Sequence, residues 1–170
     1  MKIAAFDIGG TSLKMGIVSS EGKILVQDKA AIQNSDGDQI LAEILRWLDL
    51  QHGYEGIAIS VPGYVNPFTG LITNGGSIRR FDHFNLKIWL EQQCNLPVSI
   101  ENDANCALLA EKWLGKARQL NDFLCLTIGT GIGGEFSLMA TWFVADISAL
   151  ANLVICLAHG LERSALAAIQ

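Results

Sequence analysis

The chain has 170 residues, half of them hydrophobic and 17% charged, which suffices for one packed domain or for one domain and a fragment. Its formal net charge is −5, and no basic stretch is present to neutralise a phosphate backbone, so nucleic acid is excluded as a partner. The four cysteines lack C-x-x-C spacing, which favours buried, reduced thiols. Asp7 interrupts the first apolar run, so a signal peptide is excluded and a cytoplasmic location is expected.

The predicted elements alternate between β-rich and helical runs. Strands are expected over residues 2–8, 13–19, 23–32, 56–61, 97–101 and 122–128, and helices over residues 36–51, 86–94 and 102–114. Ser35 or Asp36 can cap the first helix, and Asn85 can cap the second. The short connections among the first three strands predict an antiparallel meander. The helical crossovers that follow require a mixed, partly parallel sheet with covered faces, hence an α/β fold.

The first chemistry-bearing stretch is Asp7-Ile8-Gly9-Gly10-Thr11, which directly follows a buried strand. Two glycines allow backbone N–H groups to approach a ligand oxyanion, and the Thr11 hydroxyl can donate to phosphate. Asp7 can hold Mg²⁺, directly or through water. An ordinary strand-to-strand turn is the alternative.

A second glycine-rich turn follows the last predicted strand, in the sequence Gly-Thr-Gly-Ile-Gly-Gly from Gly129 to Gly134. It matches G-x-G-x-x-G, but the acid that a dinucleotide-binding fold needs about 20 residues later is absent, since Ala149 and Leu150 stand there. No G-K-[ST] follows, so a Walker loop is excluded as well.

The third stretch is Glu101-Asn102-Asp103-Ala104-Asn105, between an apolar strand and an apolar helix. An aspartate at the carboxyl end of a strand is well placed to accept a proton from a hydroxyl group. A helix cap formed by Asn102 or Asp103 is the alternative, and it does not exclude catalysis.

Several single residues are expected to have structural roles. The histidines in polar loops and the Arg79-Arg80 pair are expected at the surface, although the arginines could also face a ligand phosphate. Tryptophans on the predicted helices are expected in the core or at its edge. These residues are His52, His83, Trp47, Trp89 and Trp113.

Four segments, in order, resemble the motifs of the ROK family (repressor, open reading frame, kinase). "FDIGGTSLKMGIV" resembles its first phosphate motif, and "SVPGYVNPFTGLI" a family segment with Pro-Gly at a strand end. "ENDANCALLAEKWLG" is similar to its sugar and catalytic motif, and "LTIGTGIGG" to its second phosphate motif. The resemblance covers residues 1–134 and is strongest to glucokinase-like and β-glucoside-kinase-like members.

The resemblance implies a ribonuclease-H-like lobe of the actin/hexokinase-type ATPase fold, with a mixed five-stranded sheet. It implies ATP- and Mg²⁺-dependent phosphorylation of a hexose or glucoside hydroxyl, with Asp103 as general base and Asp7 near the metal. The implied sugar-binding residues are Asn102, Asp103, Gly63, Asn74 and Ser77. The residues implied to cradle phosphates are Gly9, Gly10, Thr11, Thr130 and Gly131.

The chain also departs from the family pattern. Family members are about twice as long, and their second lobe supplies further sugar, zinc and adenosine contacts that are not recognisable here. We therefore expect residues 1–134 to be the N-terminal lobe, the second lobe to be missing, and the chain as written to be inactive, since one lobe cannot close around ATP. A remnant or a non-catalytic sugar-binding or regulatory protein is the alternative. The parent protein is expected to be a cytoplasmic homodimer that binds sugar and ATP.

Residues 135–170 form an apolar tail with a single glycine, Gly160. A frameshift explains it: the codons of Met139-Ala140 force a glycine in the shifted frame, those of Trp142-Phe143 force a valine, and neighbouring codons permit N-G-D-L-V-R-G-G. A divergent helical tail is the alternative, and the coding DNA distinguishes the two. A membrane helix over residues 141–157 is disfavoured because the segment is short and contains Asp146 and Asn152.

Overall fold

The computed structural model of the chain describes residues 1–120, 123, 125–128 and 132–135. Its centre is a five-stranded sheet in the order β3-β2-β1-β4-β8. β1 (Lys2–Ile8), β2 (Ser12–Ser19) and β3 (Ile24–Ala31) form an antiparallel meander. β4 (Ile57–Val61) and β8 (Val98–Asn102) continue the sheet parallel to β1. The predicted mixed α/β sheet is therefore confirmed.

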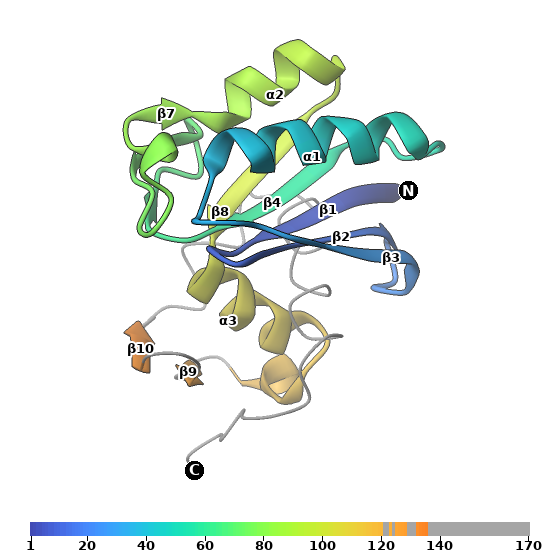
Figure 1. Cartoon of the computed structure of the whole chain (residues 1–170). Coiled ribbons are helices and arrows are strands. Elements are labelled where there is room, and N and C mark those ends of the chain that lie inside the picture. Colours follow the sequence, from blue (N-terminus) through green and yellow to red (C-terminus); the bar gives the residue numbers. More distant parts are fainter. Residues whose placement is uncertain (121–122, 124, 129–131, 136–170) are drawn as a thin grey trace.

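Helices cover both faces of this sheet (Figure 1). α1 (Gly37–Leu50) and α2 (Leu86–Cys94) pack on one face, and α3 (Asp103–Trp113) packs on the other. The Asp36 carboxylate caps α1 by accepting from two N–H groups of its first turn, and the Asn85 side chain caps α2 by accepting from the Ile88 N–H. Both caps confirm the sequence prediction.

Two hydrophobic clusters follow the alternation of side chains along each strand. Phe6 and Ile8 of β1 point to the α1 side, where Phe6 meets Trp47 edge to face, with ring centroids 5.5 Å apart. Ile3 and Ala5 point to the α3 side. The residues on that side are mostly small, so α3 lies close to the sheet and Cys106 of α3 is completely buried.

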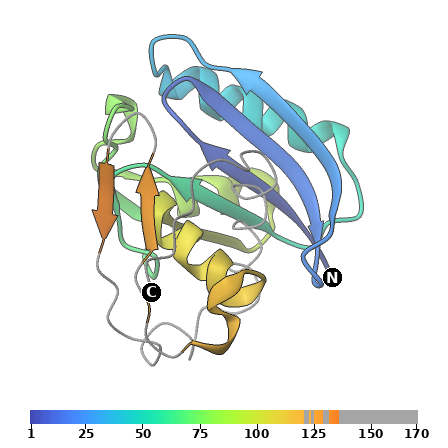
Figure 2. The ribbon, with the colours of Figure 1, turned by 90° about the horizontal axis from the view of Figure 1, so that it is seen from below.

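Two parts of the fold differ from the sequence prediction. The strand predicted at residues 122–128 is described over Cys125–Ile128 as β9, which pairs with β10 (Ile132–Glu135) in a separate two-stranded sheet beside α3 (Figure 2). Residues 62–85, where no strand is predicted, contain β5 (Tyr64–Val65), β6 (Leu71–Asn74) and β7 (Phe84–Asn85), which form a small antiparallel sheet. Strands of two to four residues are too short to show a periodic pattern.

Two 3₁₀ turns complete the described elements, η1 (Arg79–Phe81) and η2 (Lys116–Gln119). The predicted phosphate residues Thr130 and Gly131 and the tail from residue 136 onward lie outside the described residues. Within the described part of the chain, none of the helices combines the length and the hydropathy that crossing a bilayer requires.

Candidate active site

The three parallel strands bring three of the four predicted motifs to one edge of the sheet. In the strand register, Asp7 of β1 lies opposite Ser60 of β4, and Ser60 lies opposite Glu101 of β8. Because β1, β4 and β8 run in the same direction, the segments that follow them leave the sheet at the same edge. In open α/β sheets, ligands bind at this carboxyl edge.

The carboxylate of Asp7 is held from two sides. The Ser60 hydroxyl donates to Oδ1 across 3.1 Å, and the Lys14 ammonium lies 3.2 Å from Oδ2. The side chains of Asp7 and Lys14 are each only 17% exposed, so solvent screens this ion pair less than a surface pair. Asp7 therefore has a fixed orientation at the end of β1.

The turn after Asp7 packs against the predicted sugar loop. The Gly9 N–H donates to the Ser12 carbonyl across 2.9 Å, which closes the turn. A Cβ atom at Gly10 would lie 2.7 Å from Ser77 Oγ, so a larger residue would push Ser77 away from the turn. Ser77, predicted to bind sugar, and Gly10, predicted to bind phosphate, are thus neighbours.

Gly63 joins β4 to the same loop. Its φ of +86° and the 2.0 Å between a hypothetical Cβ and the Asn74 carbonyl oxygen both require glycine. The Asn102 side-chain amide donates to the Gly63 carbonyl across 2.8 Å, and the Gly76 N–H donates to the Asn74 side chain across 2.8 Å. Contacts therefore link the end of β8 to the end of β4 and to the loop after β6.

The junction between β8 and α3 presents Asp103 at this edge. Asn102 caps α3, because its Oδ1 accepts from the N–H groups of Ala104 and Asn105. Buried Glu101 accepts from the Asn102 N–H and from the Asn105 side-chain amide. Asp103 is exposed as the first residue of the helix. Of the two caps predicted for this stretch, Asn102 or Asp103, the structure has Asn102, and the Asp103 carboxylate lies at the surface of the edge.

The arrangement suits a magnesium ion that is shared with a substrate. Among the described residues, no three His, Cys, Asp or Glu side chains cluster as a metal cage. Mg²⁺ commonly uses one or two carboxylates, substrate phosphate oxygens and several waters. Asp7, beside a turn whose N–H groups suit phosphate, fits that donor set.

Cys106 lies beneath this edge, on the buried side of α3. Burial raises the pKa of its thiol well above the ordinary value of 9.0, and the charge of Glu101 adds to the rise. A hydrogen bond with the Ser60 side chain lowers that pKa in part. The thiol is free and buried, as the cysteine spacing predicts.

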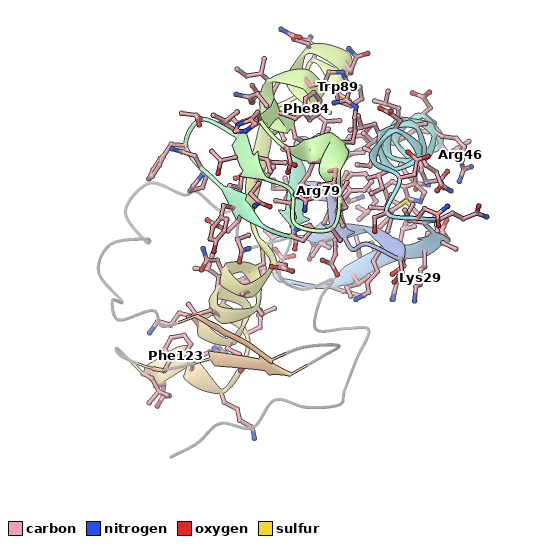
Figure 3. The ribbon with its side chains drawn as sticks, turned by 60° about the vertical axis from the view of Figure 1, so that its left-hand side comes forward. Lys29, Arg46, Arg79, Phe84, Trp89 and Phe123 are labelled. Carbon is pink, nitrogen blue, oxygen red and sulfur yellow. The ribbon has the colours of Figure 1, made fainter. Side chains whose placement is uncertain are left out.

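The single residues expected at the surface are found there. Arg79 lies 3.5 Å from Asp82, and Arg80 pairs with Asp38 at 2.7 Å while it lies 4.7 Å from the centre of the Phe84 ring. Figure 3 shows Phe84 and Trp89 next to each other and Arg79 below them. Both histidines in the described loops are exposed, Trp47 is buried, and the other two tryptophans are half-buried, as predicted for His52, His83, Trp89 and Trp113.

Sequence reasoning missed the residues that support the site from neighbouring strands. Ser60 and Lys14 lie within two of the segments that resemble family motifs, but the sequence assigns neither of them a role. The strand register alone places them beside Asp7. The signal that could have found them is a polar residue on the face of a strand that is otherwise buried.

Comparison with known proteins identifies the family of the chain. Residues 3–140 match the ROK family. The beta-glucoside kinase of Listeria monocytogenes is 69% identical over 134 residues, which are 79% of this chain and 46% of that protein. The beta-glucoside kinase of Klebsiella pneumoniae is 61% identical over 134 residues, 79% of this chain and 45% of that protein. The chain therefore spans about half the length of the curated relatives that it matches.

A solved structure shows the same fold. The ROK family glucokinase of Streptomyces griseus, solved in complex with glucose and AMPPNP, superposes with a TM-score of 0.70 at 34% identity. The superposition covers 79% of this chain and 43% of that protein. The expected actin/hexokinase-type lobe with its mixed five-stranded sheet is thereby confirmed, and the chain belongs to the ROK family.

Proposed function

We propose that the protein transfers the γ-phosphoryl group of ATP to a hydroxyl group of a hexose or a glucoside. The observation that carries this proposal is the meeting of three motifs at one sheet edge. Asp7 lies near the end of β1 and is followed by the Gly9–Thr11 turn. Gly63 follows β4 and contacts Asn74, and Asp103 follows β8, so all of these segments lie at that edge. Family membership supports the same activity.

In the proposed mechanism, the oxygen of the sugar hydroxyl attacks the γ-phosphorus, and the Asp103 carboxylate accepts the proton of that hydroxyl. The bond between that phosphorus and the bridging oxygen breaks, and ADP leaves. Backbone N–H groups of Gly10 and Thr11, together with Thr130 and Gly131, bind phosphate oxygens, whereas the Gly9 N–H closes the turn on the Ser12 carbonyl. Such transfers depend on positioning and on charge stabilisation more than on covalent chemistry, so one base and a set of donors suffice.

The proposed metal is Mg²⁺, which would neutralise charge on the phosphates. Asp7 is the residue that would hold it, directly or through water. Lys14 and Ser60 hold the Asp7 carboxylate in one orientation with one contact on each oxygen, and the remaining lone pairs of those oxygens could accept the metal or a water bound to it. ATP as the donor also supports a cytoplasmic location.

The proposed acceptor is a β-glucoside. Relatives named beta-glucoside kinase are 69% and 61% identical to this chain, whereas the glucokinase of Thermotoga maritima is 34% identical. Asn102, Asp103, Gly63, Asn74 and Ser77 would bind the sugar hydroxyls. Their mutual contacts support this, because a site that selects among hydroxyls needs polar groups at fixed positions.

The test uses a chimera, because the chain spans about half of its relatives. The 134 matching residues of the Listeria monocytogenes beta-glucoside kinase are replaced by those of this chain. ADP release is measured with MgATP and, in turn, cellobiose, an aryl β-glucoside and glucose. We expect β-glucoside-dependent ADP release that exceeds release with glucose. ADP release no higher with any sugar than without one would overturn the proposed function.

The same assay on residues 1–170 alone tests the expectation that one lobe is inactive. Sugar-dependent product from this chain would overturn that expectation. A chain that binds sugar without turnover would fit the alternative of a non-catalytic sugar-binding protein.

A further inference from the structure

The connection between β3 and α1 has an unusual backbone. Asn34 and Ser35 are consecutive residues with φ of 52°, in the left-handed region that non-glycine residues rarely occupy. The connection is nevertheless held by ordinary hydrogen bonds. The Asp36 N–H donates to the Gln33 carbonyl across 2.9 Å, and the Gln33 N–H donates to the Gln39 side chain across 3.0 Å. Such strain persists only where the surrounding structure fixes it, and it is often associated with function.

This strained backbone places the Ser35 hydroxyl on the phosphate turn. Ser35 Oγ donates to the Gly10 carbonyl across 3.1 Å, although 25 residues separate them. The next carbonyl of the turn, that of Thr11, accepts from the Ile32 N–H across 2.9 Å. Two successive carbonyls of the turn are therefore anchored on the segment before α1.

Anchoring a carbonyl also orients the N–H of the same peptide. In a trans peptide the C=O and N–H groups point in opposite directions. The bond from Ser35 to the Gly10 carbonyl therefore directs the Thr11 N–H away from Ser35. An N–H group fixed in advance binds an anion without a cost for reorganisation.

Gly10 leaves room for this hydroxyl because it has no side chain. A Cβ atom at Gly10 would lie 2.9 Å from Ser35 Oγ and 2.7 Å from Ser77 Oγ. Two serine hydroxyls from different loops thus meet at the second glycine of the turn. Glycine at position 35 would remove the backbone strain, but it would also remove the donor.

We propose that Ser35 is a positioning residue for the phosphate turn, which orients the Gly10–Thr11 peptide toward a nucleotide phosphate. Ser35 touches neither phosphate nor sugar and acts through the peptide that it holds. The proposal rests on the proposed function, since a nucleotide phosphate is the ligand of that turn.

The test compares two glycine substitutions in the 170-residue chain. Ser35→Gly removes the hydroxyl and the left-handed strain together. Asn34→Gly is the matched control, because it removes the same strain at a residue whose exposed side chain has no part in the bond to Gly10. The amide signals of Gly10 and Thr11 are followed by ¹⁵N NMR in both variants, with MgATP and with inorganic pyrophosphate as probes.

We expect Ser35→Gly to shift the free-state Thr11 amide signal, to speed its hydrogen exchange, and to weaken MgATP binding about tenfold. Asn34→Gly should leave all three unchanged. Equal behaviour of the two variants in the free state would overturn the inference whether or not the chain binds nucleotide. If the chain binds neither probe while Ser35→Gly still shifts the Thr11 signal, the anchoring of the peptide is confirmed and the binding comparison is made in the chimera. There, an unchanged KM for ATP in Ser35→Gly would overturn the role toward phosphate.

Discussion

The requirement for glycine at position 63 can be tested against a second glycine with similar backbone geometry. Gly63 and Gly53 have φ of +86° and +75°. A Cβ atom at Gly53 would meet no atom within 4 Å, whereas one at Gly63 would lie 2.0 Å from the Asn74 carbonyl oxygen and 2.9 Å from the Gly76 nitrogen. The two alanine variants therefore share the backbone strain and differ in the steric clash.

The expected magnitudes follow from these contacts. Left-handed backbone costs alanine about 1–2 kcal/mol, and the stiffer unfolded chain offsets about 0.4–1 kcal/mol of that cost. Gly63→Ala must also displace the backbone near Asn74, at about 1–3 kcal/mol. It strains or breaks the hydrogen bond from Asn102 to the Gly63 carbonyl, which is worth about 1 kcal/mol. We expect Gly63→Ala to lose roughly 2–4 kcal/mol more unfolding free energy than Gly53→Ala.

The assay is urea unfolding followed by tryptophan fluorescence, in which buried Trp47 reports on the core. Equal midpoints for Gly63→Ala and Gly53→Ala would refute the argument that the backbone of Asn74 excludes a side chain at position 63. A larger loss for Gly53→Ala would refute it as well.

Three further predictions concern the support of the site. Asn102→Asp keeps the α3 cap but replaces the amide that donates to the Gly63 carbonyl with a carboxylate oxygen, which cannot donate. The substitution should therefore lower the unfolding free energy, measured in urea, by about 1–3 kcal/mol. No loss would show that the hydrogen bond from Asn102 to Gly63 contributes nothing to stability. Lys14→Met should lower the Mg²⁺ concentration that the chimera needs for half-maximal ADP release, because the Lys14 ammonium competes with the metal for the Asp7 carboxylate, and an unchanged Mg²⁺ dependence would contradict the proposed metal role of Asp7. Because burial raises the pKa of Cys106, the folded chain keeps a proton that the unfolded chain releases above about pH 9, so stability should fall there by up to about 1.4 kcal/mol per pH unit. Cys106→Ala should make that decline shallower, and an identical decline would show that this thiol is not its source.

The features that sequence predicted correctly are the local ones. The residues of α2 and its cap at Asn85 could be predicted because capping depends on residues within one helical turn. The glycine turn after Asp7 and the acid after β8 could be located because each directly follows a buried apolar run. The order of the strands then brings these segments to one edge.

The features that sequence did not predict depend on the three-dimensional fold. Ser60 reaches Asp7 only because β4 lies beside β1 in a particular register. Ser35 could be proposed only as a possible helix cap, whereas Asp36 caps α1 and the Ser35 hydroxyl bonds to Gly10. Serine and aspartate have similar preferences for the cap position, so the sequence alone does not choose between Ser35 and Asp36. The backbone conformation of the connection decides which of them caps the helix.

Substitution of Asp103 in the chimera is the most direct test of the account. Asp103→Asn keeps the size of the side chain and leaves the cap formed by Asn102 intact, so the fold should survive. If Asp103 accepts the proton of the sugar hydroxyl, β-glucoside-dependent ADP release should fall roughly 100- to 10,000-fold with little change in the KM for ATP. ADP release at the rate of the unsubstituted chimera would contradict the account.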